Sequence, residues 1–174
     1  ITATFIPGDK SAYQERFVRW LPRAAAAGLT GVYDAWAAAP SEQEAYEIWH
    51  SISESGELSL RIFGSVRETD SADLIANRFK KFEQNFSSEM VRPEAIKLAV
   101  DGVPEGHTAF LLTPYVDSTN EDFGQPMISR ENLTANVTTY FSRDIPIHIH
   151  AIGGAAVRMS LDAIESARAT TGND

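Results

Sequence analysis

The sequence predicts an α/β fold in which parallel strands are covered by outer helices. Segments with helical spacing of apolar residues alternate along the chain with short runs of apolar residues typical of buried strands. A parallel connection between neighbouring strands needs a long crossover, and each intervening segment is long enough to hold a helix. The 174 residues, of which 43% are hydrophobic, suffice for one domain with a substantial core.

The first two helices are marked by the residues at their ends. Residues 11–27 carry an alanine-rich apolar pattern that Gly28 ends, although Pro22 interrupts it. Ser41 and Glu44 have the spacing of a capping box, in which each of the two side chains accepts a hydrogen bond from the backbone amide of the other residue. The helix that follows this box is the most clearly marked in the sequence.

Three further helices follow the same logic. Asp70 or Ser71 caps the third, and Ser129 opens the fourth. The fifth runs from Ala155 to about Ala169, and a polar tail follows it. Between the third and fourth helices, residues 102–120 are rich in Gly, Pro and aromatic residues. A connection of this length in a compact domain is typical of a functional loop or hairpin.

Four runs predict strands, and we expect Pro93 to break the chain before the third of them. The runs are residues 30–35, 58–66, 95–101 and 145–152. Four strands with helices between them form either a small open sheet or an arc of a (β/α)8 barrel. A closed barrel needs about 250 residues, so on the barrel interpretation the chain is a segment of one.

Two histidines share one face of the last predicted strand. Because side chains alternate along a strand, His148 and His150 point to one side while Ile147 and Ile149 stay close to the core. Ligands of α/β units bind beyond the carboxyl ends of the strands, and His150 lies at that end. The residues alone leave two interpretations open: a ligand-binding pair, or rim histidines satisfied by hydrogen bonds.

Lys97 lies in the middle of an apolar strand, where a charged ammonium is costly to bury. The lysine could extend to solvent from a strand edge, pair with Asp101, or indicate a different register of the strand. Alternatively, a lysine with a lowered pKa reacts with carbon dioxide, and the carbamate that forms supplies oxygen ligands to one or two metal ions. Such a ligand suits a site of histidines and oxygens without sulfur.

Composition excludes several classes of function. The net charge of -9 argues against nucleic acid or an anionic membrane as a partner. No cysteine is present, which excludes disulfides, thiolate zinc sites and cysteine nucleophiles. No apolar run approaches the roughly 18 residues of a membrane span, and no Gly-X-Ser-X-Gly elbow is present. We therefore expect a soluble, cytoplasmic protein.

Two long motifs resemble one known family. The run from Ile96 through Lys97, Asp101 and Gly102 to Ala109, followed by His150-Ala151-Ile152-Gly153, is similar to the metal-dependent amidohydrolase superfamily. The nearest branch contains the N-substituted formamide deformylases, and residues 28–35 resemble its second-strand region. The resemblance extends over residues 17–168.

This resemblance implies a (β/α)8 barrel that binds one or two divalent metals, usually zinc, and hydrolyses an amide or other non-peptide C–N bond with a metal-activated water. Lys97 matches the fourth-strand lysine that can be carboxylated, and His150 matches the fifth-strand histidine ligand. A further set of residues is expected to contact a small amide-type substrate: His148, Asp101, His107 and Thr108.

The chain also departs from the family pattern. It has no His-X-His motif near its start, no later histidine strand and no terminal aspartate strand, so no catalytic residue is assigned within it. Relatives commonly have an aspartate where this chain has Gly154, and a carboxylate that could cap the last helix is therefore absent.

The hypothesis is that residues 1–174 form one α/β segment, roughly the second to fifth strands, of an amidohydrolase barrel whose flanking parts are absent. Alone, it is expected to be inactive. Unpaired strand edges would favour a homo-oligomer or association with the rest of the barrel. The alternative is a non-enzymatic α/β domain that binds a small ligand or a protein.

Overall fold

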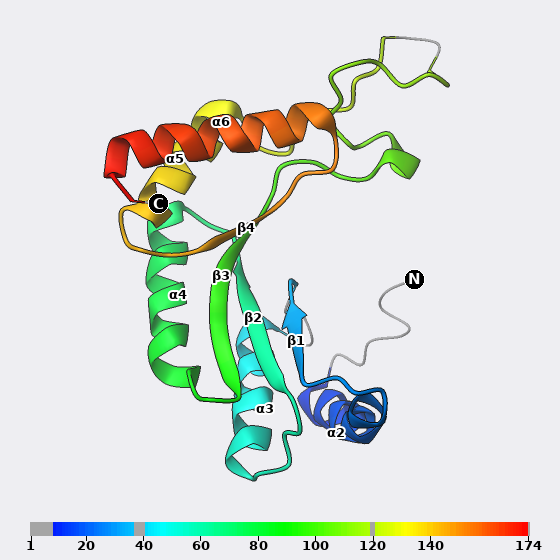
Figure 1. Ribbon diagram of the computed structural model, residues 1–174, viewed down its shortest axis with the longest axis vertical. Helices are drawn as coiled ribbons and strands as arrows, with labels where there is room; N and C mark the ends of the chain where they lie inside the picture. Colours follow the sequence, from blue (N-terminus) through cyan, green and yellow to red (C-terminus); the bar gives the residue numbers. More distant parts are fainter. Residues whose placement is uncertain (1–8, 37–40, 119–120, 174) are drawn as a thin grey trace. The chain divides into compact units, whose positions relative to one another are not determined.

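The computed structural model describes residues 9–36, 41–118 and 121–173. Helices alternate with strands along the chain (Figure 1). The elements in order are α2 (Lys10–Ala26), β1 (Gly31–Asp34), α3 (Glu42–Glu54), β2 (Arg61–Arg67), α4 (Ala72–Phe86), β3 (Val91–Ala99), the short 3-10 helix η1 (Pro104–Gly106), α5 (Arg130–Phe141), β4 (Ile147–His150) and α6 (Gly154–Thr171).

The strands form one sheet in the order β1-β2-β3-β4, so strands adjacent in sequence are neighbours in the sheet. β1 pairs with β2 and β3 pairs with β4, both in parallel. This order, with a helix between each pair of successive strands, is that of consecutive units of a (β/α)8 barrel. The predicted α/β class with parallel strands, outer helices and a partial barrel topology is confirmed.

The chain divides into two compact units, which we describe separately. The first contains α2, β1, α3 and β2, most of α4 and the beginning of β3. The second contains the beginning of α4, the end of β3 and the elements from η1 to α6. All of the residues expected to form the functional site belong to the second unit.

In the first unit, α3 packs its aromatic face on β2. The Ser41 hydroxyl accepts a hydrogen bond from the Glu44 amide at 3.2 Å and donates to the Glu44 carboxylate at 2.7 Å, so this start of a helix is as predicted. Tyr46 and Trp49 are buried against Gly64 of β2, where a Cβ atom would collide with the Tyr46 ring. Glycine at this position therefore lets the helix approach the strand.

Two prolines lie inside regular elements. Pro22 lies inside α2, as the helix predicted over residues 11–27 implies, and α2 continues to Ala26 and buries Leu21 and Ala24. The prediction that Pro93 breaks the chain before the third strand is wrong, because β3 begins at Val91 and runs through Pro93. The fixed φ of proline suits an extended strand, and only one backbone donor is lost.

In the second unit, α5 and α6 pack against each other (Figure 1). α5 contributes Leu133, Val137 and Tyr140, all fully buried. The buried positions of α6 are mostly small, which lets the two helices approach closely; they are Ala155, Ala156, Met159, Ser160, Ala163 and Ala167. Among the described residues, no helix has both the length and the apolar character needed to cross a membrane.

Candidate functional site

The register of β3 and β4 brings Lys97 beside the two histidines. Lys97 is paired with His148, and Ala99 is paired with His150. Paired residues of parallel strands project to the same face, and residues two apart on one strand do so as well. Lys97, His148 and His150 therefore share one face of the sheet; the alternation in the sequence predicted this for the two histidines, and the register adds Lys97.

Lys97 is buried, with 7% of its surface exposed. Within the described ranges, no carboxylate lies within ion-pair distance of its ammonium group, and an ion pair with Asp101 is not formed. Burial lowers the pKa of Lys97 below the ordinary lysine value of 10.5. The free amine, which is the reactive form of lysine, is thereby favoured.

The His150 ring is oriented by a backbone group. Its Nε2 lies 3.0 Å from the carbonyl oxygen of Gly102. A carbonyl only accepts hydrogen bonds, so Nε2 carries the proton and Nδ1 of the neutral ring carries the lone pair. A backbone carbonyl that fixes the tautomer in this way is the usual support of a metal-binding histidine.

The surroundings of His148 disfavour its protonated form. Burial lowers its pKa, and the charges of Lys97 and His150 lower it further. Neutral imidazole is the form that coordinates metals or accepts a hydrogen bond. On the face that these two residues share with His150, the pKa values of both Lys97 and His148 are therefore lowered.

Asp101 lies directly beyond β3 and is 1% exposed. Its Oδ1 accepts a hydrogen bond from the Ile152 amide at 2.9 Å, and its Oδ2 accepts from the amides of Gly153 and Phe110, each at 2.8 Å. All three donors belong to backbone groups of the loops that follow β3 and β4. The carboxylate thus joins these loops, and its expected contact with substrate stays a prediction.

Thr108 closes a short turn after Asp101. Its hydroxyl accepts from the Val103 amide at 2.9 Å and donates to the Val103 carbonyl at 3.2 Å. Its own carbonyl accepts from the Gly102 amide at 2.8 Å. A Cβ on Gly102 would collide with the Thr108 side chain, so this turn requires glycine. A substrate contact by Thr108 is untested.

His107 lies in the loop after β3, between two carboxylates. Nε2 is 3.2 Å from Asp117, Nδ1 is 3.3 Å from Asp122, and the ring is stacked on Tyr115 with centroids 4.2 Å apart. Both carboxylates raise the pKa of His107, Asp117 most strongly. None of these contacts joins His107 to Lys97 or His150, and its expected substrate contact stays a prediction.

The donor set fits part of a divalent metal site. The His150 ring would offer Nδ1, because Nε2 is bonded to the Gly102 carbonyl, and Lys97 as a carbamate would offer oxygens, which suits zinc and similar ions. Among the described residues, no group of three or more His, Cys, Asp or Glu side chains is placed to hold a metal. A complete site would therefore need the carbamate and ligands from outside this chain.

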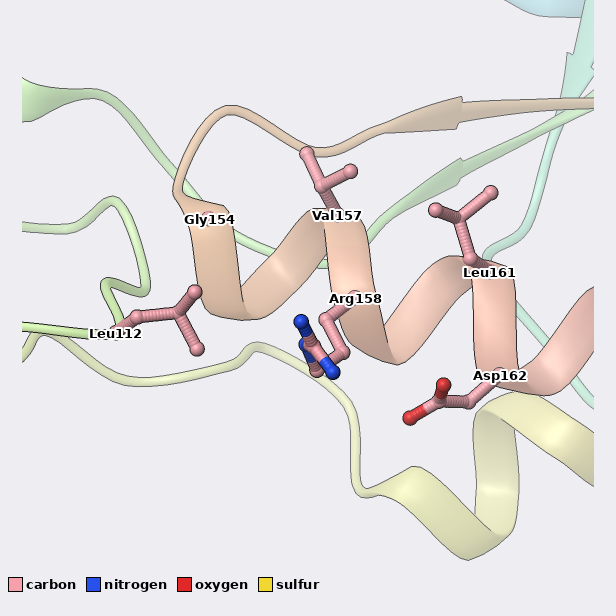
Figure 2. A pocket seen from close by; sticks show the side chains of 6 residues that line it. All are labelled: Leu112, Gly154, Val157, Arg158, Leu161 and Asp162. Carbon is pink, nitrogen blue, oxygen red and sulfur yellow. The ribbon is translucent and has the colours of Figure 1, made fainter.

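A cavity of about 320 Å³ lies elsewhere on the second unit, against the exposed side of α6 (Figure 2). Leu112 comes from the loop after β3, and the other lining residues belong to α6: Gly154, Val157, Arg158, Leu161 and Asp162. None of the predicted site residues lines it. The cavity is therefore a feature of the outer helix surface and not of the face that carries Lys97.

A family model described as the amidohydrolase family matches residues 2–174. The chain belongs to the amidohydrolase family. The family resemblance drawn from Lys97, Asp101 and His150 is thereby confirmed, although its assignment to the formamide deformylase branch is not tested. Comparison with curated proteins gives no match.

Two solved structures share the fold of this amidohydrolase chain. One is an uncharacterized metal-dependent hydrolase from Pyrococcus horikoshii OT3, with 22% identity and a TM-score of 0.68; it aligns over 90% of this chain and 31% of its own. The other is an uncharacterized metal-dependent hydrolase from Pyrococcus furiosus, with 21% identity and a TM-score of 0.70, over 91% and 32%. The chain spans about a third of the length of either protein.

Proposed function

We propose that this chain is the central part, about the second to fifth strands, of a metal-dependent hydrolase that cleaves an amide or other non-peptide C–N bond in a small molecule. The family assignment supports hydrolysis, and the length of the solved relatives supports a larger barrel. The observation that carries the proposal is the shared face of Lys97, His148 and His150. We propose that its substrates belong to the class used by the deformylase-like branch of the family.

Lys97 and His150 are the proposed ligands of one or two divalent ions, most suitably zinc. The unprotonated Nζ of Lys97 forms a bond to the carbon of carbon dioxide and releases a proton, which leaves an anionic carbamate. The pKa of Lys97, lowered by burial, increases the fraction of amine available for this step. When bound, the metal would supply an activated water and polarise the scissile carbonyl.

Three further residues are proposed to contact substrate. His148 lies beside Lys97 in the sheet, and His107 and Thr108 belong to the loop that follows β3. The general acid or base is proposed to lie outside the chain, so the isolated segment should be inactive. A cytoplasmic location, and a homo-oligomer or association with the rest of the barrel, stay predictions.

Metal retention tests the proposed ligands. The purified chain would be dialysed against zinc with bicarbonate, and its metal content and intact mass measured on the same sample. We expect weak but saturable zinc binding, because two protein ligands leave an ion mostly hydrated. Lys97→Met and His150→Ala should each abolish it, whereas His107→Ala should retain it. Equal zinc binding by all four proteins would contradict the assignment.

Hydrolysis is tested in the longer protein encoded by the natural reading frame. That frame should add a His-X-His motif upstream, and a histidine strand and an aspartate strand downstream. Replacement of Lys97 or His150 there should lower the kcat for N-substituted amides by at least about a hundredfold. Full activity in both variants would disprove the proposed roles.

One observation favours a non-enzymatic alternative, in which the domain binds a small ligand or a protein. The His150 ring already has a hydrogen-bond partner in Gly102, as a structural histidine would. On this alternative, zinc binding would not depend on Lys97 or His150, and the reading frame would lack the additional ligand motifs.

A further inference from the structure

The carboxylate of Asp101 connects three segments that are far apart in sequence. Asp101 follows β3, Phe110 belongs to the loop after η1, and Ile152 and Gly153 form the turn between β4 and α6. Both carboxylate oxygens accept backbone hydrogen bonds, and the side chain is almost completely buried. A carboxylate so occupied has little capacity left for a ligand.

Phe110 makes the second connection between the loop and α6. Its carbonyl oxygen accepts hydrogen bonds from the amides of Ala155 at 3.0 Å and Ala156 at 3.2 Å. These donors lie in the first turn of α6, where backbone amides lack partners within the helix. The N-cap residue Gly153 makes no side-chain cap, so the Phe110 carbonyl fulfils this role in place of a side-chain carboxylate.

Gly153 makes this close approach possible. A Cβ at this position would collide with the backbone of Phe110. The Gly153 amide bonds to Asp101, while Phe110 bonds both to Asp101 and to α6. The loop after β3 and the turn after β4 therefore form one continuous network of hydrogen bonds centred on Asp101.

The next residue in the chain connects this network to His150. The Gly102 carbonyl accepts the Nε2–H of His150, and the Gly102 amide is held by Thr108. The Gly102 carbonyl belongs to the planar peptide between Gly102 and Val103, whose amide donates to the Thr108 hydroxyl at 2.9 Å, and Asp101 anchors the chain directly before Gly102. His150 itself lies two residues before Ile152, which bonds to the same carboxylate.

We propose that Asp101 is a positioning residue, which fixes the tautomer and orientation of His150 by holding the Gly102 carbonyl and the turn after β4 together. This role takes the place of the substrate contact expected for Asp101. The purpose of this role rests on the proposed function, in which His150 is a metal ligand. The same network connects the loop after β3 to that histidine.

The test uses Asp101→Asn in the 174-residue chain without metal. An asparagine oxygen can occupy only one of the two carboxylate positions, and its NH2 group would face backbone donors at the other. The nitrogen chemical shifts of the His150 ring, measured by NMR, report the tautomer directly. We expect the ratio of Nε2–H to Nδ1–H forms to fall about fivefold, the effect of losing one ordinary hydrogen bond.

Glu42→Gln is the matched control. Glu42 is also a buried carboxylate that accepts a backbone hydrogen bond, from the Arg67 amide at 2.6 Å, but it belongs to the other unit. Its replacement should reduce the free energy of unfolding without changing the His150 tautomer ratio. A change of the ratio in both variants would show a general loss of stability and would overturn the proposal.

The proposal would also be overturned if Asp101→Asn folds, loses the amide hydrogen bonds of Ile152 or Gly153, and keeps the His150 tautomer ratio. If that variant does not fold, Gly153→Ala, which displaces Phe110 from the opposite side, should produce the same change of tautomer. If neither folds, hydrogen exchange in the unsubstituted chain decides. The amides of Phe110, Ile152 and Gly153 should then have similar protection factors, and protection factors that differ by more than about tenfold would contradict the network.

Zinc binding distinguishes this proposal from the proposed function. If the natural chain binds zinc but Asp101→Asn leaves the tautomer unchanged, the metal site stands and the positioning role fails. If the tautomer changes but no zinc binds, Asp101 positions a histidine that is not a ligand.

Discussion

Glu42 and Lys97 are charged residues that are equally buried, each with 7% of its surface exposed, yet their surroundings differ. Glu42 accepts from the Arg67 amide and lies 3.7 Å from the Arg67 Nε and 3.3 Å from the Arg78 Nε. For Lys97, the described residues provide no carboxylate at ion-pair distance. One charge has charged partners where α3, β2 and α4 meet, and the other lies on the face of the sheet that carries two histidines.

The two residues differ in whether neighbouring groups oppose the effect of burial on the pKa. Burial raises the pKa of Glu42, but the Arg67 amide and the two arginines oppose this effect. Burial lowers the pKa of Lys97, with no opposing contribution. The contacts of Glu42 offset part of the cost of burying its charge, whereas no contact offsets this cost for Lys97, whose free amine is thereby favoured.

Removal of the compensated charge should have the largest effect. Glu42→Ala leaves two arginines without their carboxylate and should reduce the free energy of unfolding by about 3–5 kcal/mol. Urea unfolding followed by circular dichroism measures this loss. Glu54→Ala, at the exposed end of α3, is the matched control and should change stability by at most about 0.5 kcal/mol. Similar losses in the two variants would remove the distinction drawn here.

Removal of the uncompensated charge should have a smaller effect in the opposite direction. Lys97→Met replaces a buried amine by an apolar side chain of similar length and should leave the free energy of unfolding unchanged or raise it by about 1 kcal/mol. A loss of several kcal/mol in the same urea experiment would show that Lys97 has a stabilising partner.

The pH dependence of this effect has a defined sign. Because the folded-state pKa of Lys97 lies below 10.5, the unfolded chain binds more protons between the two values. Stability should therefore rise with pH in this interval and should do so less in Lys97→Met. An identical pH dependence in the two proteins, measured below the titration of the tyrosines, would contradict the lowered pKa.

The smallest effects concern two histidines whose pKa values shift in opposite directions. The pKa of His107 should be above 6.5 and that of His148 below it, as measured by NMR titration. Asp117→Asn should lower the pKa of His107, and Lys97→Met should raise that of His148. The contribution of protonated His107 to stability is complete below pH 6.5 and is lost as the pH rises through its raised pKa. Shifts of the same sign in both histidines would be inconsistent with the two environments.

The sequence predicted the parts of the fold that depend on local pattern. Ser41 and Ser129 cap α3 and α5 as expected, and the alternation in β4 correctly placed His148 and His150 on one face. The break at Pro93 was wrong because strand pairing tolerates the loss of a single donor.

The loop connections could not be read in the same way. Asp101 is bonded by the backbone amides of Phe110, Ile152 and Gly153, and a backbone amide leaves no signature in a sequence. The glycine at 153 was visible, but its role depends on the approach of Phe110, which is 43 residues earlier in the chain and close only after folding. The ionisable residues could therefore be found from the sequence, whereas the backbone hydrogen bonds that connect them could not.

The central claim is that Lys97 and His150 form one half of a metal site, and zinc titration followed by NMR of the histidine rings tests it most directly. Zinc added with bicarbonate should perturb the Nδ1 signal of His150 first, while its Nε2 keeps the proton donated to Gly102, and Lys97→Met should weaken the response. A zinc response confined to His107, or one at His150 that is unchanged in Lys97→Met, would contradict the claim.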